Sequence, residues 1–182
     1  MVLSLVLLPF LILPIIILVL LSTLDTGQWG VFSQARVGQY GRLFKIYKIR
    51  TLKNEPHHLG QLNYSATRLG QFLRHTKLDE LPQVFNVIFG QMSFVGPRPD
   101  VPGFADLLEG ADRIILKVKP GITGPATIKY KDEESLLAMQ EDPETYNRTN
   151  IWPDKVEINK KYVMTWSFSL DLRLVLESLF RC

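Results

Sequence analysis

The first 24 residues of this chain carry no charged side chain, and this segment constrains the fold more than any other. It is almost entirely aliphatic, and a helix of this length can cross a hydrocarbon core about 30 Å thick. It lacks the basic start and the small-residue cleavage site of a signal peptide, and its apolar run is longer. We therefore expect a permanent membrane anchor over residues 1–24 and one globular domain over residues 25–182.

Prolines interrupt the expected anchor, and Pro14 lies near its middle. The ring of Pro14 would clash with the carbonyl of Phe10, and it removes one helical hydrogen bond. The segment can therefore be a kinked helix that spans the bilayer, or a helix that turns at Pro14 and leaves on the side where it entered. The residues alone leave both possibilities open.

Between Asp25 and Glu55 every charged side chain is basic: Arg36, Arg42, Lys45, Lys48, Arg50 and Lys53. Basic residues next to a membrane segment favour the cytoplasmic side, so we expect the domain to lie in the cytoplasm. The net charge of +3 is too small to indicate a nucleic-acid partner. The local cluster instead suits anionic lipid headgroups or a phosphate-bearing ligand.

The pattern of residues 25–182 predicts an α+β fold made of short helices and a β-hairpin. Strands are expected over 31–36 and 43–51, and helices over 66–75, 82–89, 101–116 and 132–139. We expect irregular structure from residue 140 to about residue 160. The apolar stretch 162–180 predicts a C-terminal helix, either at the membrane interface or packed on the core.

Two adjacent carboxylates, Asp79 and Glu80, precede Pro82 at the expected start of a helix. Proline fits the first turn of a helix. Because the free N–H groups and the dipole there favour negative charge, Asp79 could stay ionised and act as a nucleophile. A phosphate or a divalent cation could join it. Taken alone, such a pair is more often a helix cap followed by a first-turn acid.

Basic side chains that could hold an anion occur on both sides of this pair. Lys48 and Arg50 are two residues apart on an expected strand, so they should share one face. Arg98 lies between prolines in Gly96-Pro97-Arg98-Pro99, and a rigid loop would offer its guanidinium to two phosphate oxygens. A solvated strand face and an ordinary proline-rich turn are the alternative explanations.

Motifs follow the anchor in a fixed order: Phe32-x-Gln34-x-Arg36-x-Gly38, Phe44-x-x-Tyr47-Lys48-x-Arg50-Thr51, Leu73-Arg74, Leu78-Asp79-Glu80-Leu81-Pro82-Gln83, Asn86-Val87, Met92-Ser93-x-Val95-Gly96-Pro97-Arg98-Pro99 and Pro120-Gly121-Ile122-Thr123-Gly124. In this order they closely resemble the bacterial sugar transferase family, the monotopic phosphoglycosyl transferases that begin glycoconjugate assembly. The resemblance covers nearly the whole chain. The Asp-Glu and Gly-Pro-Arg-Pro elements are highly specific together.

This resemblance implies that a UDP-sugar donates its sugar-1-phosphate to polyprenyl (undecaprenyl) phosphate and releases UMP, as the first membrane step of polysaccharide or glycoconjugate assembly. Asp79 would attack the β-phosphate and form a covalent aspartyl-phosphosugar intermediate, and Glu80 would bind the cofactor Mg²⁺. The residues expected to bind the substrate or its phosphates are Gln34, Arg36, Lys48, Arg50, Arg74 and Arg98.

The resemblance also implies a re-entrant anchor that turns at Pro14. It places the chain at the bacterial cytoplasmic membrane, in contact with its lipids, with the catalytic domain on the cytoplasmic face. Family members usually have a basic pair just before the apolar run, whereas this sequence starts within that run, and Leu13 stands where a serine is common. The identity of the sugar and the formation of a homodimer stay open.

A protein of another class would fit the same composition: a membrane-anchored protein that binds a nucleotide sugar or a lipid phosphate without turnover. The intact pair Asp79 and Glu80 argues against it, because a pure binding protein needs no nucleophile.

Overall fold

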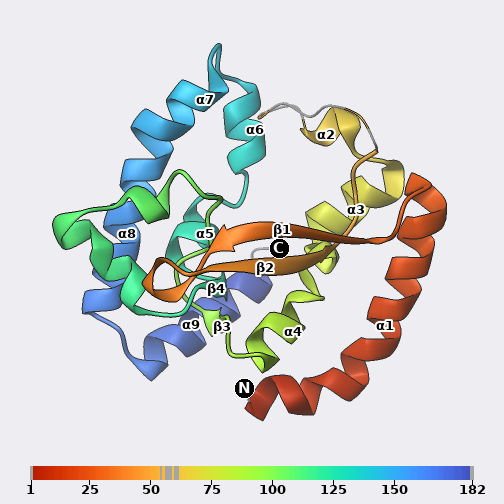
Figure 1. The fold of residues 1–182 in the computed structure, drawn as a ribbon, viewed down its shortest axis with the longest axis horizontal. Coiled ribbons are helices and arrows are strands. Elements are labelled where there is room, and N and C mark those ends of the chain that lie inside the picture. Colours follow the sequence, from red (N-terminus) through yellow and green to blue (C-terminus); the bar gives the residue numbers. More distant parts are fainter. Residues whose placement is uncertain (1, 54, 56–58, 60–61, 181–182) are drawn as a thin grey trace.

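The computed structural model describes residues 2–53, 55, 59 and 62–180, and it has an α+β architecture (Figure 1). A long N-terminal helix, α1 (Val2–Thr26), lies along one side of a domain of short elements. Strands β1 (Val31–Val37) and β2 (Leu43–Ile49) form the predicted antiparallel hairpin. The other helices are α2 (Leu62–Ser65), α3 (Arg68–Thr76), α4 (Gln83–Ile88), α5 (Pro125–Lys129), α6 (Glu133–Ala138), α7 (Pro143–Tyr146), α8 (Trp152–Met164) and α9 (Phe168–Phe180).

Helix α1 is long and apolar enough to cross a membrane, with a mean hydropathy of 3.1 over an 18-residue window within Leu3–Thr26. Most of its large apolar side chains are exposed. The helix continues through Pro9 and Pro14, and Figure 1 shows that it curves rather than ends. Proline is the usual cause of such a bend, since it removes a hydrogen bond and crowds the preceding turn. A turn at Pro14 within a membrane stays a prediction.

The C-terminal end of α1 is tied to the hairpin by hydrogen bonds. Ser22 Oγ donates to the carbonyl of Arg50 at 2.6 Å. Thr23 Oγ1 accepts from the N–H of Gly30 at 2.9 Å. A Cβ on Gly30 would lie 2.1 Å from the carbonyl oxygen of Val19, so only glycine lets the chain pass this close to the helix. The anchor therefore leaves the domain in a defined direction.

The buried side chain of Asn86 fixes α4 against β2. Its Nδ2 donates to the carbonyl of Lys45 at 2.8 Å, and its Oδ1 accepts from the N–H of Tyr47 at 3.3 Å. Val87 packs beside it on Ile46 in a small apolar cluster. Because Asn86 is fully buried, these bonds satisfy groups that water cannot reach. They hold the segment before α4 next to β2.

A second, parallel sheet joins β3 (Ser93–Val95) to β4 (Gly121–Thr123). Gly121 and Gly124, at the two ends of the Gly-Ile-Thr-Gly part of the 120–124 motif, closely approach the protein's own backbone. A Cβ on Gly121 would lie 2.2 Å from the nitrogen of Gly96, and one on Gly124 would lie 2.2 Å from the oxygen of Gly96. These glycines let β4 pack directly on the start of the Gly-Pro-Arg-Pro loop.

The predicted helix over 101–116 is wrong. This segment instead contains two 3₁₀-helices, Ala105–Leu107 and Gly110–Lys117. Gly103 and Gly110 have φ angles of +98° and +55°, which lie outside the right-handed helical region. The apolar spacing suggested a helix, but these left-handed positions divide the chain into shorter turns.

The segment 140–160, predicted to be irregular, is largely helical. It contains α7, the π-helix Asn147–Ile151 and most of α8. Val156, Asn159 and Tyr162 are buried along one side of α8, at helical spacing. Pro153 lies in the first turn, where a missing N–H has no cost. A polar composition obscured this pattern in the sequence.

The C-terminal stretch forms α9, which packs on the core along one side only. Leu174 is buried in a cluster with Val95 and Tyr162. Thr123 Oγ1 at the end of β4 donates to Ser178 Oγ at 3.1 Å. Large apolar side chains on the rest of α9 are exposed, among them Phe168 and Phe180. The helix therefore has a core-facing side and an uncovered apolar side.

Candidate active site

Asp79 and Glu80 lie in a short 3₁₀-helix, Leu78–Glu80, between α3 and α4. Lys77 ends α3 with a left-handed φ of +59° and turns the chain into this segment. The residue at the cap position of α4 is Pro82, and no side chain caps that helix. The alternative explanation of Asp79 as a helix cap is therefore wrong. Both carboxylates are buried, so the domain encloses two acidic groups.

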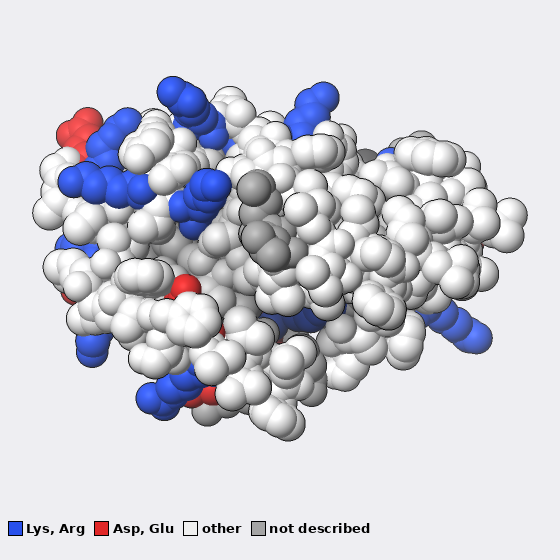
Figure 2. All heavy atoms as spheres, turned by 90° about the horizontal axis from the view of Figure 1, so that it is seen from below, with Lys and Arg blue, Asp and Glu red and all other residues white. Residues whose placement is uncertain are grey.

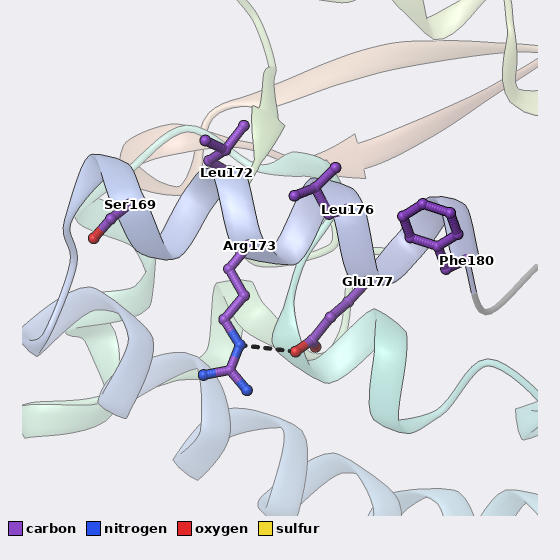
Figure 3. A pocket seen from close by; sticks show the side chains of 6 residues that line it. All are labelled: Ser169, Leu172, Arg173, Leu176, Glu177 and Phe180. Carbon is purple, nitrogen blue, oxygen red and sulfur yellow. Dashed lines mark hydrogen bonds and ion pairs between the residues drawn. The ribbon is translucent and has the colours of Figure 1, made fainter.

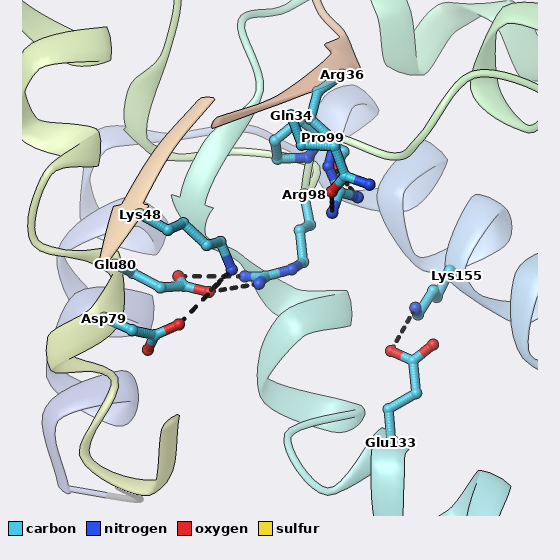
Figure 4. Close-up of polar contacts among 9 residues, drawn as sticks. All are labelled: Gln34, Arg36, Lys48, Asp79, Glu80, Arg98, Pro99, Glu133 and Lys155. Atoms are coloured by element: carbon cyan, nitrogen blue, oxygen red, sulfur yellow. Dashed lines mark hydrogen bonds and ion pairs between the residues drawn. The ribbon is translucent and has the colours of Figure 1, made fainter. Parts of the chain in front are cut away.

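Glu80 is the centre of an ion cluster (Figure 4). Lys48 Nζ donates to Glu80 Oε1 at 2.8 Å, and the Arg98 guanidinium donates to both carboxylate oxygens. Burial alone would raise the pKa of Glu80, but the charges and hydrogen bonds of Arg98 and Lys48 outweigh it and hold the pKa below its ordinary value. Glu80 is therefore ionised at neutral pH.

Asp79 lies beside this cluster but is bonded less closely. Its Oδ2 is 4.0 Å from Lys48 Nζ, and its carboxylate accepts no hydrogen bond within the described part of the chain. Burial and the charge of Glu80 raise the pKa of Asp79, against the attraction of Lys48, Arg74 and Arg98. We expected the helix start to keep Asp79 readily ionised; burial outweighs that effect.

The loop that carries Arg98 is held from two sides. The carbonyl of Pro97 accepts from the N–H of Gly121 at 2.9 Å, and that of Asp100 accepts from the N–H of Val37 at 2.9 Å. The charge of Glu80 raises the pKa of Arg98 above its ordinary value. The rigid presentation predicted from the two prolines is thus reinforced by β1 and β4.

Gln34 and Arg36, which we expected to bind substrate phosphate, contact this loop and each other. Arg36 Nη1 donates to the carbonyl of Pro99 at 3.3 Å, and Nη2 donates to Gln34 Oε1 at 2.7 Å. Burial, together with the nearby charge of Arg98, lowers the pKa of Arg36 to about 10. Figure 4 shows Gln34, Arg36 and Pro99 grouped together, apart from the two carboxylates.

Arg50 does not meet Lys48 as predicted. Strand β2 ends at Ile49, so the alternation of side chains stops before Arg50. Its Nε donates to the carbonyl of Trp29 at 2.9 Å, and its guanidinium lies 5.7 Å from the ring centre of Phe32. Arg50 therefore belongs to the contact between the anchor and the hairpin.

Arg74 comes to the site from α3, as predicted. It is in the last turn of that helix, and its charge acts on Asp79. The carboxylate pair is thus surrounded by Lys48, Arg74 and Arg98. A set of this kind suits an anionic ligand with several oxygens, since ammonium and guanidinium groups are strong phosphate donors.

Sequence reasoning missed a partly buried ion pair next to the site. Lys155 Nζ on α8 lies 2.6 Å from Glu133 Oε2 at the start of α6. Glu133 acts on the pKa of Arg98, and Lys155 acts on that of Asp100. Burial raises the pKa of Asp100 to about 6. Recognition of α8 as a helix with one buried side was the signal that could have placed Lys155 here.

Asp79 and Glu80 offer the oxygen ligands that Mg²⁺ prefers. Among the described residues, no group of three or more histidine, cysteine or acidic side chains could hold a metal. Mg²⁺ is commonly bound by one or two carboxylates together with water and substrate phosphates. The pair therefore fits Mg²⁺ as a shared ligand with a phosphate, not as an all-protein site.

Buried carboxylates beside clustered cations, in a domain that carries a long apolar helix, are the main features of this site. The chain belongs to the bacterial sugar transferase family, whose model matches residues 1–182. A UDP-glucose:undecaprenyl-phosphate glucose-1-phosphate transferase of Klebsiella pneumoniae is 35% identical over 178 residues, which are 91% of this chain and 36% of that protein.

Two further relatives have different lengths and names. An uncharacterized sugar transferase of Bacillus subtilis is 35% identical over 84% of this chain and 69% of its own length. A UDP-N-acetylgalactosamine-undecaprenyl-phosphate N-acetylgalactosaminephosphotransferase of Aeromonas hydrophila is 33% identical over 82% of this chain and 34% of its own length. The chain thus spans about a third of the length of several curated relatives.

Proposed function

We propose that this chain is a phosphoglycosyl transferase that moves a sugar-1-phosphate from a UDP-sugar to undecaprenyl phosphate and releases UMP. The observation that carries the proposal is the buried Asp79, which has no hydrogen bond within the described residues and lies beside a cluster of three cations. The names of relatives in two sugar classes, glucose and N-acetylgalactosamine, support the same reaction type.

The first step is attack of an Asp79 carboxylate oxygen on the β-phosphorus of the donor. A bond forms between this oxygen and phosphorus, the bond to the bridging oxygen breaks, and UMP leaves with that oxygen. The sugar-1-phosphoryl group is then held on Asp79 as an acyl-phosphate. In the second step a phosphate oxygen of the polyprenyl acceptor attacks the same phosphorus and releases the Asp79 carboxylate.

Lys48, Arg74 and Arg98 neutralise the diphosphate while the negatively charged carboxylate approaches. Without them, repulsion between the nucleophile and the phosphate oxygens would raise the barrier. Asp79 must be ionised to attack, so its raised pKa makes the step depend on pH. Glu80 holds Lys48 and Arg98 in place, because both donate to its carboxylate.

Glu80, with Asp79 next to it, would hold Mg²⁺ against the phosphates of the donor. When bound, the ion would supply positive charge to the phosphate oxygens. Glu80 Oε1 already accepts hydrogen bonds from Lys48 and Arg98. Mg²⁺ would therefore bind here only together with a donor phosphate, which supplies further oxygen ligands.

We propose that α1 and the uncovered side of α9 hold the domain at the cytoplasmic face of the bacterial inner membrane. Figure 2 shows most of the charged side chains of this view on one half, and fewer on the half that carries α1. On α9, Leu172, Leu176 and Phe180 line an open apolar groove of about 400 Å³ (Figure 3). An apolar side with a polar border is typical of an interfacial helix.

The membrane arrangement is tested by labelling of single cysteines in cells, after Cys182 is replaced by serine. With a re-entrant α1, cysteines at Leu3 and at Thr26 should both react only from the cytoplasm. Reaction of the Leu3 position from the periplasm would show that α1 spans the bilayer.

The reaction is tested by UMP release from a panel of UDP-sugars, with and without undecaprenyl phosphate. The protein is also incubated with donor alone, and the peptide containing Asp79 is examined for a phosphosugar mass. Asp79→Asn should remove both UMP release and the adduct, because an amide is a very poor nucleophile. Glu80→Gln should weaken both, with partial rescue by extra Mg²⁺.

Binding of a UDP-sugar without UMP release would favour the alternative of a non-catalytic binding protein. Turnover without an adduct, with kinetics of a ternary complex, would mean that the lipid phosphate attacks the donor directly. In that case Asp79 would not be the nucleophile.

A further inference from the structure

The ion pair between Lys155 and Glu133 differs from the other pairs outside the Glu80 cluster. Its side chains are 14% and 28% exposed, whereas each of the other pairs of the described residues leaves at least one partner more than a third exposed. Burying two charges is costly, and apolar residues in their place are often as stable or more so. Such a pair next to an active site therefore suggests a role beyond stability.

The pair lies on the far side of Arg98 from Asp79 and Lys48. Figure 4 shows Arg98 between the two groups, with Lys155 reaching in from α8. The charge of Glu133 acts on Arg98, and Lys155 is the cation that acts most strongly on Asp100. Two independent elements, α6 and α8, thus place a partly buried ion pair near Arg98 and Asp100.

The ammonium of Lys155 can donate more hydrogen bonds than the one that Glu133 accepts. It has three N–H groups, and Glu133 Oε2 accepts one of them at 2.6 Å. The ring centre of Tyr130 lies 5.6 Å from the Nζ atom and forms one wall beside it. A ligand oxygen that enters from the Arg98 side could accept a further hydrogen bond.

The geometry of phosphoryl transfer indicates which oxygen this would be. In an in-line displacement the attacking and leaving oxygens lie on opposite sides of the phosphorus. If the β-phosphorus is bound at the Arg98 guanidinium and Asp79 attacks it from the side of Glu80, the nucleotide leaves toward the opposite side, where Figure 4 shows Lys155. Negative charge develops on that leaving oxygen, and a cation there stabilises it.

We propose that Lys155 is a further catalytic residue, whose ammonium binds the phosphate of the departing nucleoside monophosphate while Glu133 holds it in position. The inference rests on the proposed function, since it takes Asp79 as the nucleophile and a nucleoside diphosphate sugar as the donor. It assigns one end of the site to the sugar phosphate and the other to the nucleotide.

The test compares Lys155→Met with Lys160→Met in the whole chain. Lys160 lies on the same helix and pairs with Asp112 at 2.9 Å, so its replacement is a matched control for loss of an α8 lysine. Binding of UMP and of uridine is measured by calorimetry, together with the rate of UMP release. Lys155→Met should weaken UMP binding about tenfold or more, the effect of losing a charge-assisted hydrogen bond. Uridine binding should not change.

Other results would refute either the assignment of Lys155 or the proposed function itself. Equal weakening of UMP and uridine in Lys155→Met, or unchanged UMP binding, would overturn the assignment. If Lys155→Met does not fold, Glu133→Gln decides: loss of the carboxylate that positions Lys155 should weaken UMP binding and leave uridine binding unchanged, and unchanged UMP binding would refute the idea. Failure of the wild-type chain to bind UMP or release it from any UDP-sugar would instead refute the proposed function.

Discussion

Replacement of Glu80 by glutamine is the strongest test of the ion cluster. Glu80 is 9% exposed and Lys48 17% exposed, and both Lys48 and Arg98 donate to the same carboxylate. Glutamine keeps the shape but removes the charge and turns one acceptor into a donor that faces two cations. Loss of one partner from a buried ion pair costs about 3–5 kcal/mol.

For a domain of this size, each 1 kcal/mol changes the melting temperature by about 2–4 °C. Arg98 is 37% exposed, so water screens part of its interaction. We therefore expect the lower part of the range, a decrease in melting temperature of about 6–12 °C. Thermal unfolding in detergent, followed by circular dichroism, measures this change without any substrate.

The pH dependence of the melting temperature is a second test of the Glu80 cluster. The pKa of Glu80 in the folded state lies below its ordinary value of 4.5, so folding favours the charged form. The stabilisation is complete above pH 4.5 and is lost as the pH falls toward the folded pKa. The difference in melting temperature between wild type and Glu80→Gln should therefore be constant from pH 7 to about pH 5 and decrease below that.

Glu177→Gln is the matched control. Glu177 pairs with Arg173 at 2.9 Å on the surface of α9, and Arg173 is 75% exposed. Exposed pairs contribute up to about 1 kcal/mol, so the expected decrease is less than about 4 °C. If the melting temperature of Glu80→Gln decreases no more than that of Glu177→Gln, the buried cluster gives the fold no net stability and the reasoning is wrong.

Two other predictions concern Asp79 and the parallel sheet. Adduct formation from a UDP-sugar should rise with pH, and its midpoint should lie above the ordinary aspartate pKa of 3.8, because burial raises the pKa of Asp79 and only the ionised group attacks; a midpoint at or below that value would contradict the burial argument. Gly121→Ala should cost at least about 1–3 kcal/mol in chemical unfolding, since its Cβ would lie 2.2 Å from the nitrogen of Gly96; a variant as stable as wild type would show that β4 can move away.

Local patterns in the sequence predicted the elements that depend on neighbouring residues. The hairpin 31–49 was predicted from runs of strand-forming residues on either side of glycines, and α3 from apolar residues at helical spacing. The approach of Lys48 to Asp79 was expected only through the resemblance to the family. No local pattern measures the distance between a strand and a turn 31 residues later.

The predictions that failed did so because they too depend on contacts between distant parts of the chain. The helix predicted over 101–116 ignored Gly103 and Gly110, whose left-handed backbone depends on the loop around them. Arg50 was assigned to the site by strand alternation, but β2 ends one residue earlier, where the chain turns toward the anchor. Lys155 was missed because its partner Glu133 is 22 residues away and no periodicity links them.

The pKa values of the two carboxylates of the site are shifted in opposite directions, and this difference fits the two roles that we propose for them. Glu80 receives the hydrogen bonds of Lys48 and Arg98, so its charge is satisfied and its pKa is lowered. Asp79, 4.0 Å from Lys48, is left with weaker partners and a raised pKa. A carboxylate that is buried but poorly bonded gains more from forming a bond to phosphorus than one already held by two cations. In the proposed reaction Glu80 therefore holds the cations in place, and Asp79 is the nucleophile.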